Sequence, residues 1–306
     1  MFFALCTVFL WSGSAFFAGR ATHVLGSISA NFWRALIAWG VLAAVAHGWG
    51  GGLGGAGLPW LLLSGVIGFG LGDLGLYLAL PRIGPRLTLL LAQCLAAPIG
   101  MLAEWCWLDR APRWEQSGGI ALILLGVGWA VAPRENLHLS RRQLRTGIAW
   151  GVLAAAGQGL GAVITQRANQ SAAATGEVLA GDPVLAGLTQ AYQRMTGGLP
   201  VALLLFLVTI QVMKRRGATT PATGRAFPWA WIMAGTLAGP VAGVAMYQAA
   251  LHQTPTGVVL AIVATTPLAI IPLSWKFDGD RPGRGAFLGA LLAVAGVVSL
   301  LAAGNT

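Results

Sequence analysis

The chain has 306 residues, of which 56% are hydrophobic and 9% charged, and it contains 44 glycines and 13 tryptophans. This composition excludes a soluble globular domain and predicts a polytopic membrane protein, and apolar runs of about twenty residues favour helices over barrel strands. The net charge of +10 does not indicate nucleic-acid binding, because the basic residues lie in short loops between apolar runs, where they orient a membrane protein.

Apolar segments of membrane-spanning length follow one another along the whole chain. The first lacks a preceding basic region and continues into similar segments, so we interpret it as a span and not as a signal peptide. One long polar connection, 167–182, ends in Asp182-Pro183, a helix N-cap followed by a first-turn proline. The ten predicted spans are 1–18, 28–47, 59–80, 87–107, 114–132, 147–166, 186–212, 228–251, 256–275 and 285–303.

The third span combines a glycine-lined face with a carboxylate. Gly65, Gly68, Gly72 and Gly75 recur at steps of three and four residues, so they share one helix face that a neighbouring helix can approach closely. Asp73 lies off that face, and an ionised carboxylate inside a bilayer costs about 2.5–3.5 kcal/mol unless a partner or water meets it. It is therefore either half of a structural ion pair or, as we favour, part of a cavity wall.

Depth along the helices links Asp73 to an arginine. Arg34 lies about six residues into the second span and Asp73 about seven residues before the third span ends, so both lie roughly 9–10 Å below one membrane surface. A salt bridge or a shared water network between them is sterically reasonable. Arg194, its second-half counterpart, has Gly243 where the carboxylate would be. It is either a snorkelling arginine near a helix end or a binder of an anion or carboxylate in the cavity.

The two halves of the chain repeat each other at an offset of 169–171 residues, as in the pair Tyr77 and Tyr247. Five spans per half is an odd number, so the second half enters the membrane upside down, as in the inverted repeats of many transporters. We expect residues 1–133 to form the first five-helix repeat, 134–146 a basic connecting loop and 147–306 the second repeat. Further matching pairs are Pro59 with Pro228, Pro85 with Pro255 and Pro98 with Pro267.

Glycines also predict a contact between the fifth and tenth spans. Gly119 and Gly126 are seven residues apart, as are Gly289 and Gly296, and this spacing keeps each pair on one helix face. We expect the two spans to pack against each other through these faces.

The chain resembles the drug/metabolite transporter superfamily, in the form with two five-helix EamA repeats, over essentially its whole length. The resemblance implies a central cavity surrounded by the first four helices of each repeat, with the fifth and tenth spans at the periphery. The residues on which it rests are Trp11-Ser12-Gly13, Phe32-Trp33-Arg34, Pro98, Asp109-Arg110 and Asp280-Arg281-Pro282.

Polar and aromatic residues inside the spans are the candidates for a transport pathway. The aromatic ones can stack on an aromatic or cationic solute, and Gln93 and Gln158 form either hydrogen bonds between helices or substrate contacts. The scattered cysteines and histidines show no CxxC or HExxH spacing, so we expect no metal, cofactor or catalytic residue. The predicted pathway residues are Trp11, Arg34, Asp73, Tyr77, Gln93, Gln158, Arg194 and Tyr247.

These features predict a secondary transporter, not an enzyme, that exports a small organic metabolite or amphipathic drug across the cell (inner) membrane. No GxxxxGK[ST] loop for ATP is present in the chain. We expect proton coupling through Asp73, and a monomer or weak homodimer in the lipid bilayer. The alternative is a non-transporting protein on the same fold, either an intramembrane enzyme or a lipid scramblase.

Loop charges predict the orientation. Fourteen of the Lys and Arg residues lie in odd-numbered loops and three in even-numbered loops, with Arg34 and Arg194 inside the membrane. Superfamily members more often keep their termini inside, but the positive-inside rule places the odd loops of this chain in the cytoplasm and both termini outside.

Overall fold

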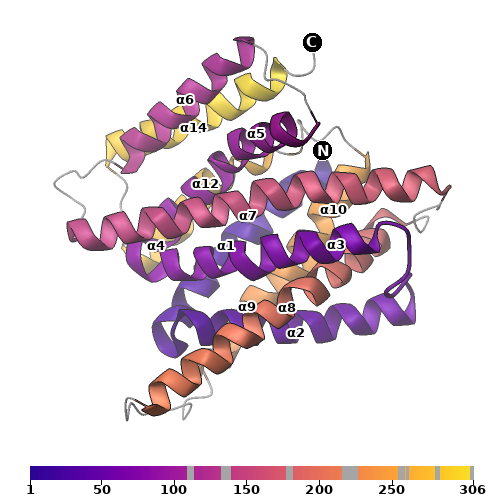
Figure 1. Cartoon of the computed structure of the whole chain (residues 1–306). Helices are drawn as coiled ribbons and strands as arrows, with labels where there is room; N and C mark the ends of the chain where they lie inside the picture. Colours follow the sequence, from indigo (N-terminus) through magenta and orange to yellow (C-terminus); the bar gives the residue numbers. More distant parts are fainter. Residues whose placement is uncertain are drawn as a thin grey trace.

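A computed structural model of the chain describes residues 1–108, 114–131, 139–176, 182–215, 227–253, 259, 262–279 and 283–303, and these described residues include no strand. Long helices lie side by side through most of the molecule (Figure 1). Six helical segments are long and apolar enough to cross a membrane. The predicted fold class, an all-helical integral membrane protein, is therefore confirmed, and the total of ten spans stays a prediction.

The second helix follows its predicted span closely, whereas the first extends beyond the predicted span 1–18 through most of the predicted loop. Helix α1 (Phe2–Leu25) is joined to α2 (Ser27–Gly48) through a single residue. Helix α3 (Leu58–Gly65) then continues through a π-helical turn, η1 (Val66–Gly72), into α4 (Asp73–Cys94). The π-helical turn was not predicted, and such turns occur frequently at functional sites.

A single non-helical residue stands where the sequence predicts a loop between the third and fourth spans. Within α4, Gly84 has a φ of +74°, a left-handed value that glycine adopts without steric cost, and it divides the helix near the predicted loop 81–86. Helix α5 (Ala96–Leu108) follows after a single turn residue.

In the second half, two helices are longer than predicted. Helix α7 (Arg141–Ala174) begins inside the predicted connecting loop and continues well into the polar link 167–182. A reciprocal capping box between Ser140 and Gln143 fixes its start, and the alanine-rich end favours helix. Helix α8 (Pro183–Arg215) begins as predicted, because the Asp182 carboxylate accepts a hydrogen bond of 2.9 Å from the backbone N–H two residues later.

The second half contains the same succession of helix, π-helical turn and helix as the first. Helix α9 (Phe227–Thr236) continues through η2 (Leu237–Gly243) into α10 (Val244–Gln253). The short helices α12 (Thr266–Ala269) and α13 (Ile271–Asp278) cover the end of the predicted span 256–275, whose first residues lie mostly outside the described part. The Asp109-Arg110 and Asp280-Arg281 motifs also lie outside it.

Helices α6 (Trp114–Val131) and α14 (Arg284–Ala302) pack against each other at one edge of the bundle (Figure 1). A Cβ atom on Gly126 would lie 2.3 Å from a backbone nitrogen of α14, and one on Gly296 would lie 2.6 Å from a backbone nitrogen of α6. The predicted glycine contact between these spans is therefore confirmed.

Two helices pack against the glycine face of the third span, where the sequence predicted one. A Cβ atom on Gly65 would lie 1.7 Å from the carbonyl oxygen of Arg194 in α8. One on Gly75 would lie 2.7 Å from the carbonyl oxygen of Trp150 in α7. These close approaches bring α7 and α8 to the helix that contains Asp73.

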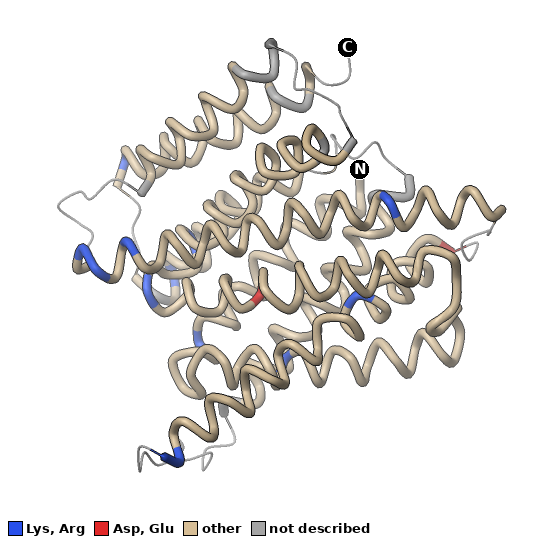
Figure 2. Tube along the Cα trace, in the orientation of Figure 1, with Lys and Arg blue, Asp and Glu red and all other residues tan. Residues whose placement is uncertain are grey.

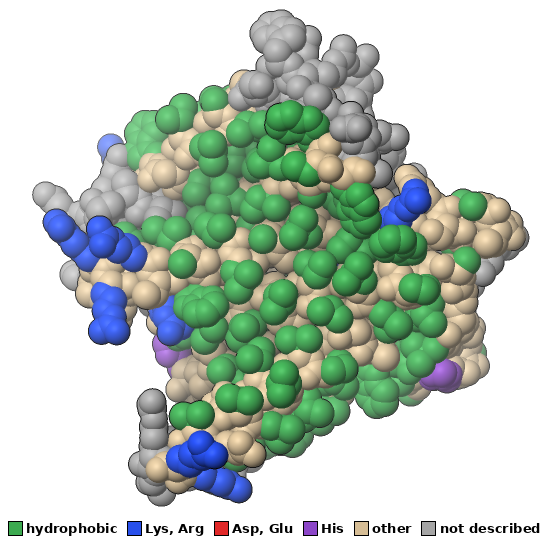
Figure 3. Space-filling model, viewed as in Figure 1, with side chains coloured by type: hydrophobic (Ala, Val, Ile, Leu, Met, Phe, Trp, Pro, Cys, Tyr) green, Lys and Arg blue, Asp and Glu red, His purple; other side chains and the backbone are tan. Residues whose placement is uncertain are grey.

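The outer surface is that of a protein immersed in lipid. Hydrophobic side chains cover the middle of the face in Figure 3. Leu204 and Leu207 of α8 are among the large hydrophobic residues exposed on the surface. Basic side chains gather where α7 begins and α8 ends (Figure 2). An apolar band with positive charge at its margin is typical of membrane proteins.

Candidate functional site

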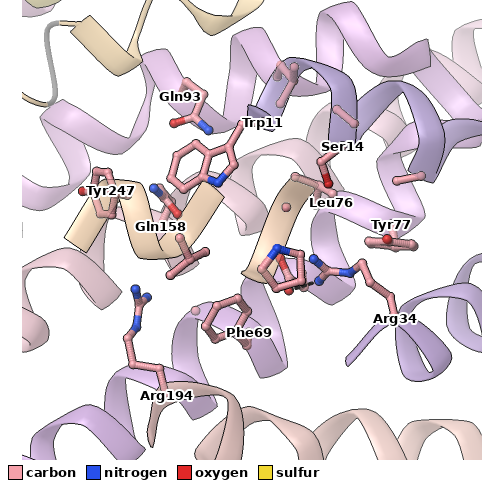
Figure 4. Close-up of a pocket in the computed structure, with 18 residues that line it drawn as sticks. Trp11, Ser14, Arg34, Phe69, Leu76, Tyr77, Gln93, Gln158, Arg194 and Tyr247 are labelled. Carbon is pink, nitrogen blue, oxygen red and sulfur yellow. Dashed lines mark hydrogen bonds and ion pairs between the residues drawn. The ribbon is translucent and has the colours of Figure 1, made fainter. Parts of the chain in front are cut away.

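A cavity of about 100 Å³ lies where α1, α2, α4, α7, α8, α10 and the two π-helical turns meet. All eight predicted pathway residues line it, although they come from six different helices (Figure 4). They are Trp11 of α1, Arg34 of α2, Asp73, Tyr77 and Gln93 of α4, Gln158 of α7, Arg194 of α8 and Tyr247 of α10.

Arg34 and Asp73 form an ion pair in the cavity wall, so the predicted pairing is confirmed. Their side chains are 8% and 19% exposed. The Arg34 guanidinium also donates a hydrogen bond of 3.3 Å to the side-chain oxygen of Asn31. Its Cζ lies 5.0 Å from the centre of the Tyr77 ring. A hydrogen bond and an aromatic face thus hold the guanidinium on the carboxylate.

Arg194 is a second buried cation at another part of the cavity. It is 6% exposed, and its Cζ lies 5.1 Å from the centre of the Phe69 ring. Its guanidinium passes Gly68 and Gly161, where a Cβ atom would lie 3.0 and 3.3 Å from Nη2. This burial in the cavity wall rules out the snorkelling alternative.

No carboxylate among the described residues pairs with Arg194, and its Nε atom has no hydrogen-bond partner there. The counterpart of Asp73 at the sequence offset is Gly243. A Cβ atom on Gly243 would lie 2.5 Å from Cδ1 and 2.7 Å from Nε1 of Trp11. The Trp11 indole therefore fills the space that an acidic side chain would need.

Further polar groups face the same part of the cavity as Arg194. The Tyr247 hydroxyl is buried without a hydrogen-bond partner in the described part of the chain, and its ring lies 5.2 Å from that of Trp11. Figure 4 shows the Arg194 guanidinium directed toward Gln158 and Tyr247, with Arg34 and Tyr77 on the other side. Among the described residues, the arginine at one end of the cavity is thus paired with a carboxylate and the arginine at the other end is not.

Sequence reasoning missed the small residues that shape this cavity. Ser14 and Gly239 line it, and a Cβ atom on Gly239 would lie 2.3 Å from the Ser14 hydroxyl oxygen. That hydroxyl donates a hydrogen bond of 2.8 Å to the carbonyl oxygen of Gly235. Small residues of this kind recur throughout the spans, so no sequence signal distinguishes those at the cavity.

A second, larger cavity of about 680 Å³ opens near the start of α2 and the end of α8. One apolar cluster contributes walls to both cavities, because it includes Tyr77 of the first and Trp33 of the second. Within the described residues no group of three His, Cys, Asp or Glu side chains is placed to bind a metal ion.

Comparison with known proteins gives a family match and a fold match. Residues 1–132 match the model of the EamA-like transporter family. No curated protein matches the chain. A solved structure titled only "Crystal structure of protein" superposes with a TM-score of 0.62 at 17% sequence identity, covering 97% of this chain and 94% of that chain. At this identity the likeness establishes the fold alone.

Proposed function

We propose that the chain is a secondary transporter of a small organic solute in the drug/metabolite transporter superfamily, because residues 1–132 match the EamA-like transporter family. The observation that supports the proposal is the convergence of eight polar and aromatic side chains on one cavity inside an apolar bundle. Ionisable residues that face a cavity within a membrane typically mark a substrate or ion pathway.

Alternating access would follow from the two halves moving against each other as inverted repeats. Two features support this part of the proposal. The π-helical turns η1 and η2 lie at the offset found in the sequence. Each cavity arginine also borders a glycine of the other half: Arg194 lies beside Gly68, and Arg34 Nη1 would lie 3.7 Å from a Cβ atom on Gly239.

Asp73 is the proposed proton-binding residue. It lines the cavity and keeps 19% of its side chain exposed, so water in the cavity can deliver a proton to it. Protonation would remove the negative charge and with it the ion pair that ties α2 to α4. A conformational change that depends on this bond would then be coupled to proton binding, and an inward proton gradient would drive export across the inner membrane.

Flux measurements in proteoliposomes test this function. A panel of anionic, neutral and cationic solutes is supplied with and without a pH gradient, to the wild type and to Asp73→Asn. We expect gradient-driven flux of at least one solute by the wild type and loss of the pH response in the variant. Asp182→Asn is the matched control, because it removes another carboxylate outside the cavity and asparagine caps a helix equally well.

Two results would count against the proposal at different levels. If no solute of the panel moves faster than through empty liposomes, the transport function is wrong. If flux is present but is the same with and without the pH gradient, transport stands and proton coupling is wrong.

A further inference from the structure

We infer that the transported solute is a small organic monoanion whose carboxylate binds Arg194. The inference rests on the proposed transport function and adds to it the chemical class of the solute. The solute carboxylate would provide beside Arg194 the negative charge that Asp73 provides beside Arg34.

The charge of the cavity lining is the first argument. Three lining residues are charged, namely Arg34, Asp73 and Arg194. The first two neutralise each other in an ion pair. A guanidinium stays protonated in proteins, so Arg194 leaves the lining with one uncompensated positive charge. A buried charge without a partner is costly, and a solute with one negative charge removes that cost.

The placement of Arg194 is the second argument. Gly68 and Gly161 leave room for the guanidinium, because a Cβ atom on either residue would lie tightly against Nη2. The Phe69 ring lies against the guanidinium at 5.1 Å from Cζ. These contacts fix its position while leaving Nε unsatisfied among the described residues. A guanidinium held in place and not paired with a carboxylate of the described residues is suited to bind the carboxylate of a solute.

The difference between the two cavity arginines is the third argument. In the first half, Arg34 has its carboxylate on α4, at Asp73. In the second half the corresponding residue is Gly243, where the Trp11 indole and the Ala238 carbonyl oxygen leave no room for a side chain. The chain therefore cannot provide the second carboxylate from this position, and a bound solute can.

The remaining walls limit the solute to a carboxylate with a compact body. The buried Tyr247 hydroxyl, without a partner in the described part, can donate to the same carboxylate, and Gln158 lies beside it in Figure 4. Aromatic faces of Trp11 and Phe69 offer apolar contact to the body. The cavity of about 100 Å³ is smaller than the roughly 150 Å³ cavity that holds a benzene molecule in another protein.

The test compares solutes that differ in charge but not in shape. Propionate is paired with propionamide, and propylammonium is the cationic member. Proteoliposome flux and thermal stabilisation in detergent are measured for the wild type, Arg194→Gln and Arg194→Lys. Arg141→Gln is the control, because it removes an exposed arginine at the start of α7, away from the cavity.

We expect the wild type to bind and move a carboxylate in preference to its amide. Arg194→Gln should lose about tenfold to a hundredfold of the carboxylate affinity, while its affinity for the amide changes little. Arg194→Lys should recover only part of the affinity, because lysine keeps the charge but not the planar fork. A folded Arg194→Gln protein is recognised by an unchanged elution profile and by its remaining affinity for the amide.

Three outcomes would overturn the inference. If the wild type moves amides or ammonium compounds and not carboxylates, the solute class is wrong while the transport function stands. If Arg194→Gln keeps the full carboxylate affinity, Arg194 is not the binding residue. If no solute of either class moves or binds, the proposed function fails, and the inference that depends on it fails too.

Discussion

The Arg34–Asp73 ion pair makes a quantitative prediction about stability. Both side chains are largely buried, with 8% and 19% of their surface exposed. Breaking a buried pair by removing one partner leaves an uncompensated charge and costs about 3–5 kcal/mol, whereas replacing both partners by apolar residues is often neutral. Because Asp73 keeps some access to the cavity, we expect a cost of about 3 kcal/mol for each single replacement, at the lower end of that range.

A double-mutant cycle measures this coupling. Arg34→Met, Asp73→Leu and the double variant are unfolded in mixed micelles, and the free energies of unfolding are compared with the wild type. Each single variant should lose about 3 kcal/mol and the double variant less than either of them, so the coupling energy should exceed about 3 kcal/mol. Additive losses, with the double variant the least stable of the three, would refute the buried ion pair.

Three further predictions concern the packing, the orientation and the charge of the cavity. Gly126→Ala should lower thermal stability, because its Cβ atom would lie 2.3 Å from the α14 backbone. Gly128→Ala, whose Cβ atom would have nothing within 4 Å, should be neutral or stabilising. Equal stabilities of the two variants would contradict the helix contact. In a protein without native cysteines, a cysteine at Ala173 should react with a membrane-impermeant thiol reagent in intact cells and one at Ala218 should not. Labelling at position 218 and not at position 173 would overturn the predicted orientation. Asp73→Asn should raise the affinity for dicarboxylates relative to monocarboxylates by about tenfold, because it leaves two uncompensated arginines; an unchanged ratio would refute the charge argument.

The features that the sequence predicted correctly depend on regular helix geometry. The Arg34–Asp73 pair could be predicted because the rise per residue of a helix is constant, so two positions counted from one membrane surface have known depths. The glycine contact of Gly126 and Gly296 followed from helical periodicity in the same way. The eight candidates that line the cavity could be selected because polar and ionisable groups are rare in apolar spans, and their role in transport stays a prediction.

The features that the sequence did not predict depend on packing between distant segments. The π-helical turns η1 and η2 arise from a local change of hydrogen-bond register that no residue type encodes. The reason for glycine at Gly243 became visible only when Trp11, far away in the sequence, was found in contact with it. The full length of α7 was missed because its polar ends were interpreted as loops, although capping and alanine content favour helix there.

The central claim is that solute passes through the cavity between the two halves, and covalent blockage of that cavity tests it most directly. Leu76 lines the cavity, whereas Leu71 is 43% exposed on the outer surface and does not line it. Each is replaced by cysteine in a protein without native cysteines, reconstituted into proteoliposomes and treated with a bulky thiol reagent. We predict that modification at position 76 stops flux and that transported solute slows this modification, while modification at position 71 has no effect. Complete modification at position 76 with undiminished flux would contradict the account.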